Sequence, residues 1–169
     1  RSYINHSSER YDLVQISLID TWAATAAGGL TLTENRLYTV EAWDDFYRAL
    51  KPGGLLSVSR WYGGEKHRGE FYRLVAIAAS ALQHKGVSAA ELRHHIVALN
   101  VGNIVTVITR PDAFTDAQWQ GARERLQAQG FKIFLGPDVT FDAITSTLLS
   151  DKADAAFFDS LPENIAPST

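Results

Sequence analysis

The chain lacks cysteine and methionine altogether, and its 169 residues include only five prolines. Without cysteine there can be no disulfide bond, no thiolate metal site and no catalytic thiol, and the redox compartment stays open. A membrane span needs about 20 apolar residues, and the longest apolar stretch, Leu74 to Leu82, is far shorter. No secretory signal is recognisable, and the chain starts at Arg1 without an initiator methionine, so we expect a fragment of a longer protein.

The chain also lacks an excess of positive charge. Its formal net charge is -3, which argues against a surface that follows nucleic-acid phosphates, so we expect no nucleic-acid partner. The composition, 46% hydrophobic, is typical of an ordinary soluble domain. We therefore expect a cytoplasmic protein, or the cytoplasmic domain of a membrane protein, with no membrane span in this fragment.

The most informative segment is Leu50-Lys51-Pro52-Gly53-Gly54, which ends a helix pattern over 39–50 and precedes an apolar strand pattern over 54–60. An earlier strand pattern covers 11–18 and is apolar enough to be buried on both faces. A strand–helix–strand unit of this length predicts adjacent parallel strands with a right-handed crossover. Ligands bind at the carboxyl ends of such strands, so Ser17 to Trp22 and Arg60 to Tyr62 are expected at the functional edge.

The remaining pattern predicts an α/β fold with a parallel core and an antiparallel hairpin at one side. Helices are expected over 69–85, over 115–128 with Trp119, Ala122 and Leu126 inward, and near 141–150; strands are expected over 96–99, 104–108 and 131–135. Two parts of the chain are distinguished, a partial α/β domain over 1–138 and a tail over 139–169 with one short helix.

Three phrases support a family resemblance: Tyr11-Asp12-Leu13-Val14 opens a strand, Ser17 and Asp20 follow with a spacing of three, and Leu-Lys-Pro-Gly-Gly closes the crossover helix. Together they resemble the spermidine synthase-like (polyamine aminopropyltransferase) branch of the class I S-adenosylmethionine-dependent methyltransferase fold. The resemblance covers roughly residues 1–110. It implies a Rossmann-like sheet of which this chain is the C-terminal half.

The resemblance also implies a chemistry. The parent protein would bind S-adenosylmethionine or decarboxylated S-adenosylmethionine, with the cofactor-binding residues upstream of Arg1, and would transfer an aminopropyl or methyl group to a small-molecule substrate. In the family the first loop aspartate takes the proton of the attacking amine and the second holds the polyamine. Here Ser17 replaces the first and Asp20 stands in the place of the second. An unassisted hydroxyl is too weak a base for that step, so we expect the isolated fragment to be inactive.

Other candidate residues allow two interpretations each. Trp22, Trp61 and Tyr62 could line a substrate pocket by cation–π contacts, or could simply pack in the core or at its rim. Arg60 could attract a carboxylate or phosphate, or could form an ion pair with an acidic neighbour such as Glu65. The histidines His84, His94 and His95 are too few and too poorly spaced for a chelate, so no metal is expected.

Two hypotheses for the whole protein therefore stand side by side. One is an alkyl-transferring enzyme; the other is a non-catalytic relic of the fold that serves as a ligand-sensing or assembly domain of a larger, membrane-attached protein. In the family's sheet the 11–18 strand would have a second neighbour from the nucleotide-binding half. Without that neighbour its edge would be open, so we expect a homo-oligomer, unless the 139–169 tail or residues 1–10 cover the edge.

Overall fold

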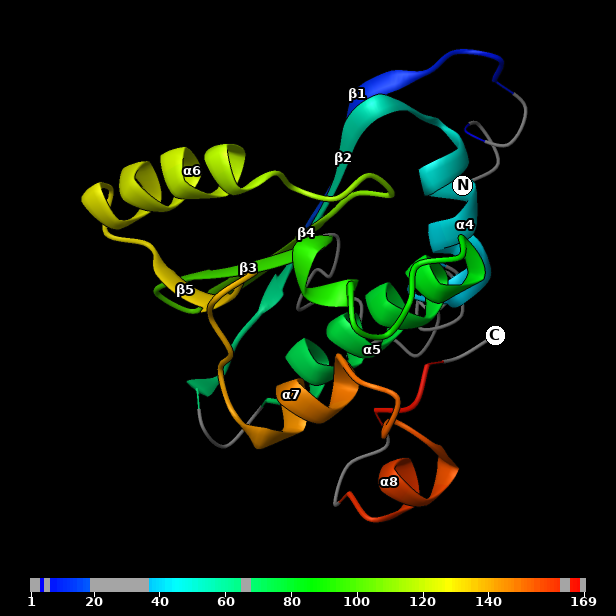
Figure 1. Cartoon of the computed structure of the whole chain (residues 1–169), viewed down its shortest axis with the longest axis vertical. Coiled ribbons are helices and arrows are strands. Elements are labelled where there is room, and N and C mark those ends of the chain that lie inside the picture. Colours follow the sequence, from blue (N-terminus) through cyan, green and yellow to red (C-terminus); the bar gives the residue numbers. More distant parts are fainter. Residues whose placement is uncertain (1–3, 5–6, 19–36, 65–67, 162–164, 168–169) are drawn as a thin grey trace, which may run out of the picture.

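One open, mixed β-sheet organises the fold in the computed structural model, which describes residues 4, 7–18, 37–64, 68–161 and 165–167. The sheet has the order β1-β2-β4-β3-β5; β1 and β2 are parallel, and each of the other neighbouring pairs is antiparallel (Figure 1). The strands are β1 (Tyr11–Ser17), β2 (Leu50–Trp61), β3 (Ile96–Val101), β4 (Ile104–Thr109) and β5 (Lys132–Leu135). The predicted α/β class with parallel strands and an antiparallel hairpin is confirmed at this level.

The helices begin where the sequence supplies a cap. Thr39 accepts a hydrogen bond from the backbone N–H of Ala42, and Thr115 and Asp142 each form a capping box, which satisfies backbone N–H groups that a helix start leaves without partners. The described helices are α4 (Val40–Arg48), α5 (Gly69–His84), the short 3-10 helix η2 (Leu92–His94), α6 (Asp116–Ala128), α7 (Ala143–Leu148) and α8 (Ala155–Asp159). The last of these was not predicted.

The parallel pair β1–β2 is the feature predicted most directly from the sequence. Val14 lies opposite Leu56 and Ser17 opposite Ser59, and α4 connects the two strands along the chain. This confirms that 11–18 and 54–60 are adjacent and parallel.

Strand β2 begins four residues earlier than predicted because Lys51, Pro52 and Gly53 form an irregularity within it. Tyr11 pairs with Leu50 while Leu13 pairs with Leu55, so the β2 side contains the extra residues. Gly53 has a φ of 76°, and its N–H donates to Asp112 Oδ2 at 2.7 Å. The glycine that was expected to close the helix therefore forms a bulge instead.

The sheet has two unlike faces, which we call the inner and the outer face. On β1 the inner face carries Val14 and Ile16, which are buried, whereas the outer face carries Leu13, which is 51% exposed. The prediction that β1 is buried on both faces is therefore wrong: its side chains alternate between core and surface, as in a sheet covered on one side only.

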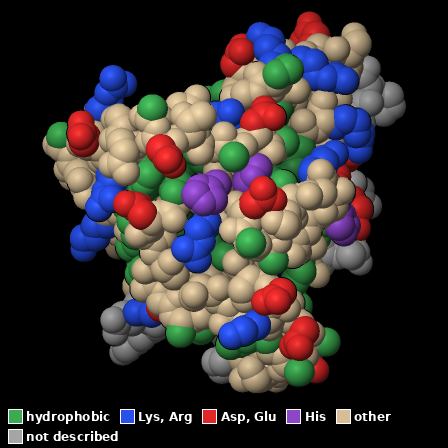
Figure 2. All heavy atoms as spheres, viewed as in Figure 1, with side chains coloured by type: hydrophobic (Ala, Val, Ile, Leu, Met, Phe, Trp, Pro, Cys, Tyr) green, Lys and Arg blue, Asp and Glu red, His purple; other side chains and the backbone are tan. Residues whose placement is uncertain are grey.

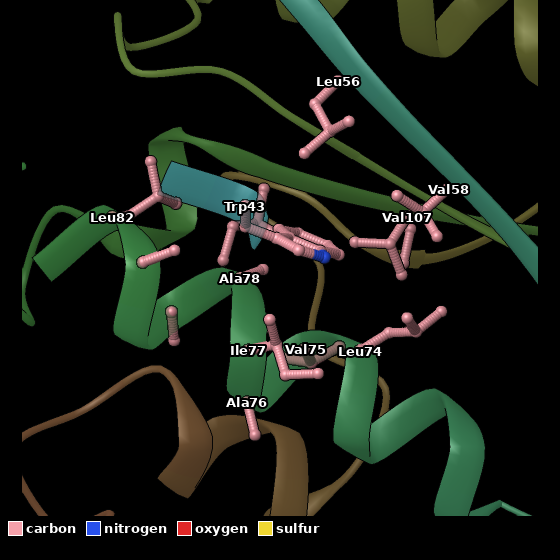
Figure 3. Packing of buried hydrophobic residues seen from close by; sticks show 14 of the residues in the cluster. Trp43, Leu56, Val58, Leu74, Val75, Ala76, Ile77, Ala78, Leu82 and Val107 are labelled. Carbon is pink, nitrogen blue, oxygen red and sulfur yellow. The ribbon is translucent and has the colours of Figure 1, made fainter. Parts of the chain in front are cut away.

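The inner face forms the main core. Trp43 of α4 lies between the sheet residues Leu56, Val58 and Val107 and the apolar stripe of α5, and it is fully buried (Figure 3). Nearby, the hydroxyl groups of Tyr47 and Thr109 are 2.7 Å apart, and burial raises the pKa of the Tyr47 phenol.

The outer face has a much smaller cluster, formed where α6 crosses the sheet. Trp119 is buried there with Val97 and Leu99, but Ala122 is exposed and Leu126 is only half-buried. Of the three residues predicted to point inward, only Trp119 is buried. The sequence of α6 explains this, because Trp119 is its single bulky apolar residue before Leu126 and most of the others are polar.

The tail packs against the helices of the inner face. α7 contacts α5, and Leu148 and Leu149 are buried in the main core (Figure 1). The described part of the tail therefore does not cover the outer edge of β1, and within the described residues no strand pairs with that edge. The homo-oligomer stays a prediction, which sedimentation would test. Across the same residues, no helix is long and apolar enough to cross a membrane.

Candidate functional site

The candidate site lies where the carboxyl ends of β1 and β2 meet. Ser17 pairs in register with Ser59, and the N–H of Leu18 donates to the carbonyl oxygen of Ser59 at 3.3 Å. The end of β1 is therefore beside the segment that leads into Arg60. Asp20 and Trp22, two of the predicted site residues, lie outside the described residues.

Leu18 has an unusual backbone conformation at this edge. Its φ is 42°, in the left-handed region that residues other than glycine seldom adopt. Such strained residues cost about 1–3 kcal/mol and cluster at functional sites, where the surrounding structure holds them in place. The conformation of Leu18 therefore marks the end of β1 as a candidate functional position.

Ser17 and Trp61 lie on the outer face of the sheet. Ser17 is exposed and Trp61 is 45% exposed. Between them, the Ser59 hydroxyl lies 2.9 Å from that of Thr106, so this serine is engaged with β4. The outer side of the edge thus presents the partly exposed ring of Trp61 and the exposed hydroxyl group of Ser17.

Arg60 points to the inner side. Its Nη2 donates to Glu70 Oε2 at 2.8 Å, and its guanidinium lies 4.5 Å from the centroid of the Tyr38 ring. One of the two interpretations of Arg60 was an ion pair with an acidic neighbour such as Glu65; Glu65 lies outside the described residues, and the structure shows such a pair with Glu70 at the start of α5. Through these two contacts, Arg60 links the start of α5 and Tyr38 to the sheet.

Tyr62 packs inside the protein. It is buried, with its ring 5.3 Å from that of Phe134 and 6.5 Å from that of Phe71, and its N–H donates to the carbonyl of Asn103 at 2.8 Å. Of the two interpretations of Tyr62, the structure favours core packing. The described members of the predicted site thus lie near one edge of the sheet, but Ser17 and Trp61 lie on the outer face, Arg60 on the inner face and Tyr62 in the core.

Sequence analysis missed a polar cluster next to this aromatic core. Tyr72 of α5 donates to Asp142 Oδ2 at 2.6 Å, and Arg68 Nη1 donates to the same oxygen at 3.4 Å. Asp142 also caps α7, so this carboxylate links the starts of two helices. The capping signature Asp142-x-x-Thr145 could have revealed the cap, but nothing local indicates its distant partners.

This cluster makes stability sensitive to alkaline pH. Burial, and then the hydrogen bond to Asp142, raise the pKa of Tyr72 to about 12. The pKa of Tyr72 in the folded state is thus above its unfolded value of about 10. The stability that protonated Tyr72 contributes is therefore complete below pH 10 and is lost as the pH rises through 12. We expect the free energy of unfolding to fall over this window, and to fall less in Tyr72→Phe. Urea unfolding at pH 9 and pH 11 measures it; equal losses in both proteins would contradict this role of Tyr72.

No group of three or more potential metal ligands occurs within the described residues. His84 Nδ1 lies 3.2 Å from Asp44 Oδ2, and His95 Nδ1 lies 3.1 Å from the carbonyl oxygen of Arg110. His94 is the last residue of the short helix η2. His84 and His95 are therefore each close to one hydrogen-bonding group of the chain.

Taken together, the edge offers an accessible serine hydroxyl, a partly exposed indole and, at Leu18, a left-handed backbone conformation, but no carboxylate among its described residues that could take a proton at Ser17. In comparisons with protein-family models and with curated proteins, the chain matches none.

Proposed function

We propose that this chain forms the acceptor-side, C-terminal half of a spermidine synthase-like domain of the class I S-adenosylmethionine-dependent fold. Three features of the described residues support the proposal. They are the parallel pair β1–β2 with α4 between them in sequence, the antiparallel hairpin β3–β4 that continues the sheet, and the position of β1 at the end of the sheet, where no described strand pairs with its second edge. The resemblance assigns that edge to the first strand of the nucleotide-binding half.

The proposed location of the reaction rests on one observation: the ends of β1 and β2 meet where Ser17 pairs with Ser59, next to the strained Leu18. We call this place the Ser17–Ser59 junction. In open sheets with parallel strands, ligands bind outside the carboxyl ends of those strands. The parent protein would place the reactive carbon of S-adenosylmethionine, or of its decarboxylated form, near this junction. When bound, the sulfonium cofactor supplies an electrophilic carbon; a nucleophile bonds to that carbon, the carbon–sulfur bond breaks, and a neutral thioether leaves.

The described residues also limit which acceptor is used. An ammonium acceptor must first lose a proton, and Ser17 cannot take it. Arg60 does not exclude a cationic acceptor, because Glu70 neutralises it. Trp61, exposed on the outer side, can contact a cationic or apolar acceptor through its ring. Methyl or aminopropyl transfer to an acceptor that needs no base at position 17 fits these residues best.

A second candidate function is a non-catalytic sensing or assembly domain. It is favoured by a specific observation: Arg60 and Tyr62 are engaged in an ion pair and an aromatic cluster within the chain, and Ser17 stands where the family has its base. This candidate predicts no alkyl transfer by the parent protein, even when a carboxylate is placed at position 17.

The identity of residue 17 gives the sharpest test of the chemistry. We expect no aminopropyl transfer from decarboxylated S-adenosylmethionine to putrescine by the 169-residue chain. In the longest natural chain that contains it, Ser17→Asp should produce spermidine, because a carboxylate restores the proton acceptor. Ser17→Asn, of the same size but without a base, is the matched control and should stay inactive. Turnover by the unmodified 169-residue chain would contradict the assignment.

A further inference from the structure

A groove lies between α6 and the outer face of the sheet, away from the edge described above. Its volume is about 390 Å³, within the usual range of small-molecule sites. The walls are mostly apolar and come from three strands, the loop before α6 and α6 itself: Leu55, Val97, Leu99, Ile108, Phe114 and Trp119. In Figure 2 hydrophobic side chains are visible along the side of the molecule on which α6 lies.

Near one part of the groove, α6 is held by Trp119 and Arg123, which contact the turn after β5. Trp119 Nε1 donates to Asp138 Oδ1 at 2.7 Å, and its ring fills the space above Gly136, where a Cβ would lie only 2.4 Å from a ring carbon. Arg123 also pairs with Asp138. Farther along the helix, the small side chain of Ala122 leaves room between α6 and the strands.

Arg125 gives the groove a charge preference. It is the one charged residue among those that line the groove, and the described residues include no acidic partner for it. The other polar groups at the groove are the amides of Gln118 and Gln129, which can donate hydrogen bonds. An apolar floor beside a guanidinium and two amides matches a ligand that has an apolar body and one anionic head.

We propose that this groove binds an amphipathic monocarboxylate, of the class of medium-chain fatty acids. The apolar chain lies on Leu99 and Ile108 between the sheet and α6, and the carboxylate is held by Arg125. The site is independent of the proposed alkyl transfer, because it shares no residue with the carboxyl ends of β1 and β2.

Calorimetry with decanoate and its neutral analogue decan-1-ol tests the site, in the 169-residue chain and in the longest natural chain that contains it. We expect saturable binding of decanoate with one site per chain. Arg125→Gln should weaken decanoate binding about fivefold, as expected for a partly exposed charged hydrogen bond, and leave decan-1-ol unchanged. Lys132→Gln removes the same charge outside the groove and should bind like the unmodified chain.

Ala122→Phe fills the groove from an exposed position on α6 and should abolish binding of both ligands without lowering the unfolding midpoint. Three results would overturn the proposal: no saturable binding of decanoate, equal affinities of the unmodified and Arg125→Gln chains for decanoate, or binding that is lost in the longer natural chain. The last result would mean that another part of the protein occupies the groove.

Discussion

Replacing Trp43 with alanine is expected to lower the free energy of unfolding by about 3–5 kcal/mol, the largest effect of any single change considered for this chain. Trp43 is fully buried between Leu56 and Val58 of β2 and the apolar side of α5 (Figure 3). Its removal would leave a cavity where the crossover helix meets both the sheet and its neighbouring helix. Urea unfolding followed by circular dichroism measures the change.

Trp43→Phe is the matched control. Within the described residues the indole Nε1 of Trp43 has no hydrogen-bond partner although it is buried. Phenylalanine keeps most of the apolar volume and removes that unsatisfied donor, so the expected loss is only about 1 kcal/mol. Similar, small losses for both variants would mean that α4 does not pack on β2 as described.

Gly54→Val is expected to have the second largest effect, a loss of about 2–3 kcal/mol from overpacking. A Cβ at Gly54 would lie 2.9 Å from the carbonyl oxygen of Tyr11 and 3.0 Å from that of Lys51. Both contacts involve backbone atoms, which cannot move aside without disturbing the β1–β2 pair. Urea unfolding again measures the loss.

Gly121→Ala supplies the control for Gly54→Val. Gly121 lies within α6, and a Cβ there would meet no atom within 4 Å. Because alanine favours the helical conformation more than glycine does, this variant should gain about 0.5–1 kcal/mol. If Gly54→Val were as stable as the unmodified chain, the close approach of β1 to the start of β2 would be wrong.

Much of the fold could be predicted because local patterns and global packing agree. The apolar face that Val40, Trp43 and Phe46 form at helical spacing is the face buried in the structure. The two apolar stretches on either side of Gly102 form the expected hairpin. The cap Thr39 marks the start of that helix, and Gly102 marks the turn of the hairpin, in the sequence itself.

What could not be predicted depends on partners distant in sequence. Nothing near Lys51 and Pro52 shows that they belong to a bulged strand; that depends on the pairing of Tyr11 with Leu50. The apolar pattern of β1 allows burial on both faces, and only the absence of a helix over Leu13 in the described fold leaves it exposed.

The same limit applies to the candidate site. The sequence placed Ser17 and Arg60 at neighbouring strand ends, because parallel strands in a crossover unit end at one edge. It could not assign their side chains to faces, since that depends on register. It also could not find Glu70 as the partner of Arg60, because no local pattern shows that the start of α5 lies beside the end of β2.

The most direct test of the central claim is calorimetric titration of the longest natural chain containing these residues with S-adenosylmethionine, its decarboxylated form and methylthioadenosine. The proposed function predicts saturable binding of at least one of the three, with one site per chain. No binding of any of them at concentrations up to about 1 mM, the upper end of usual Michaelis constants, would contradict the alkyl-transfer proposal and favour the non-catalytic domain.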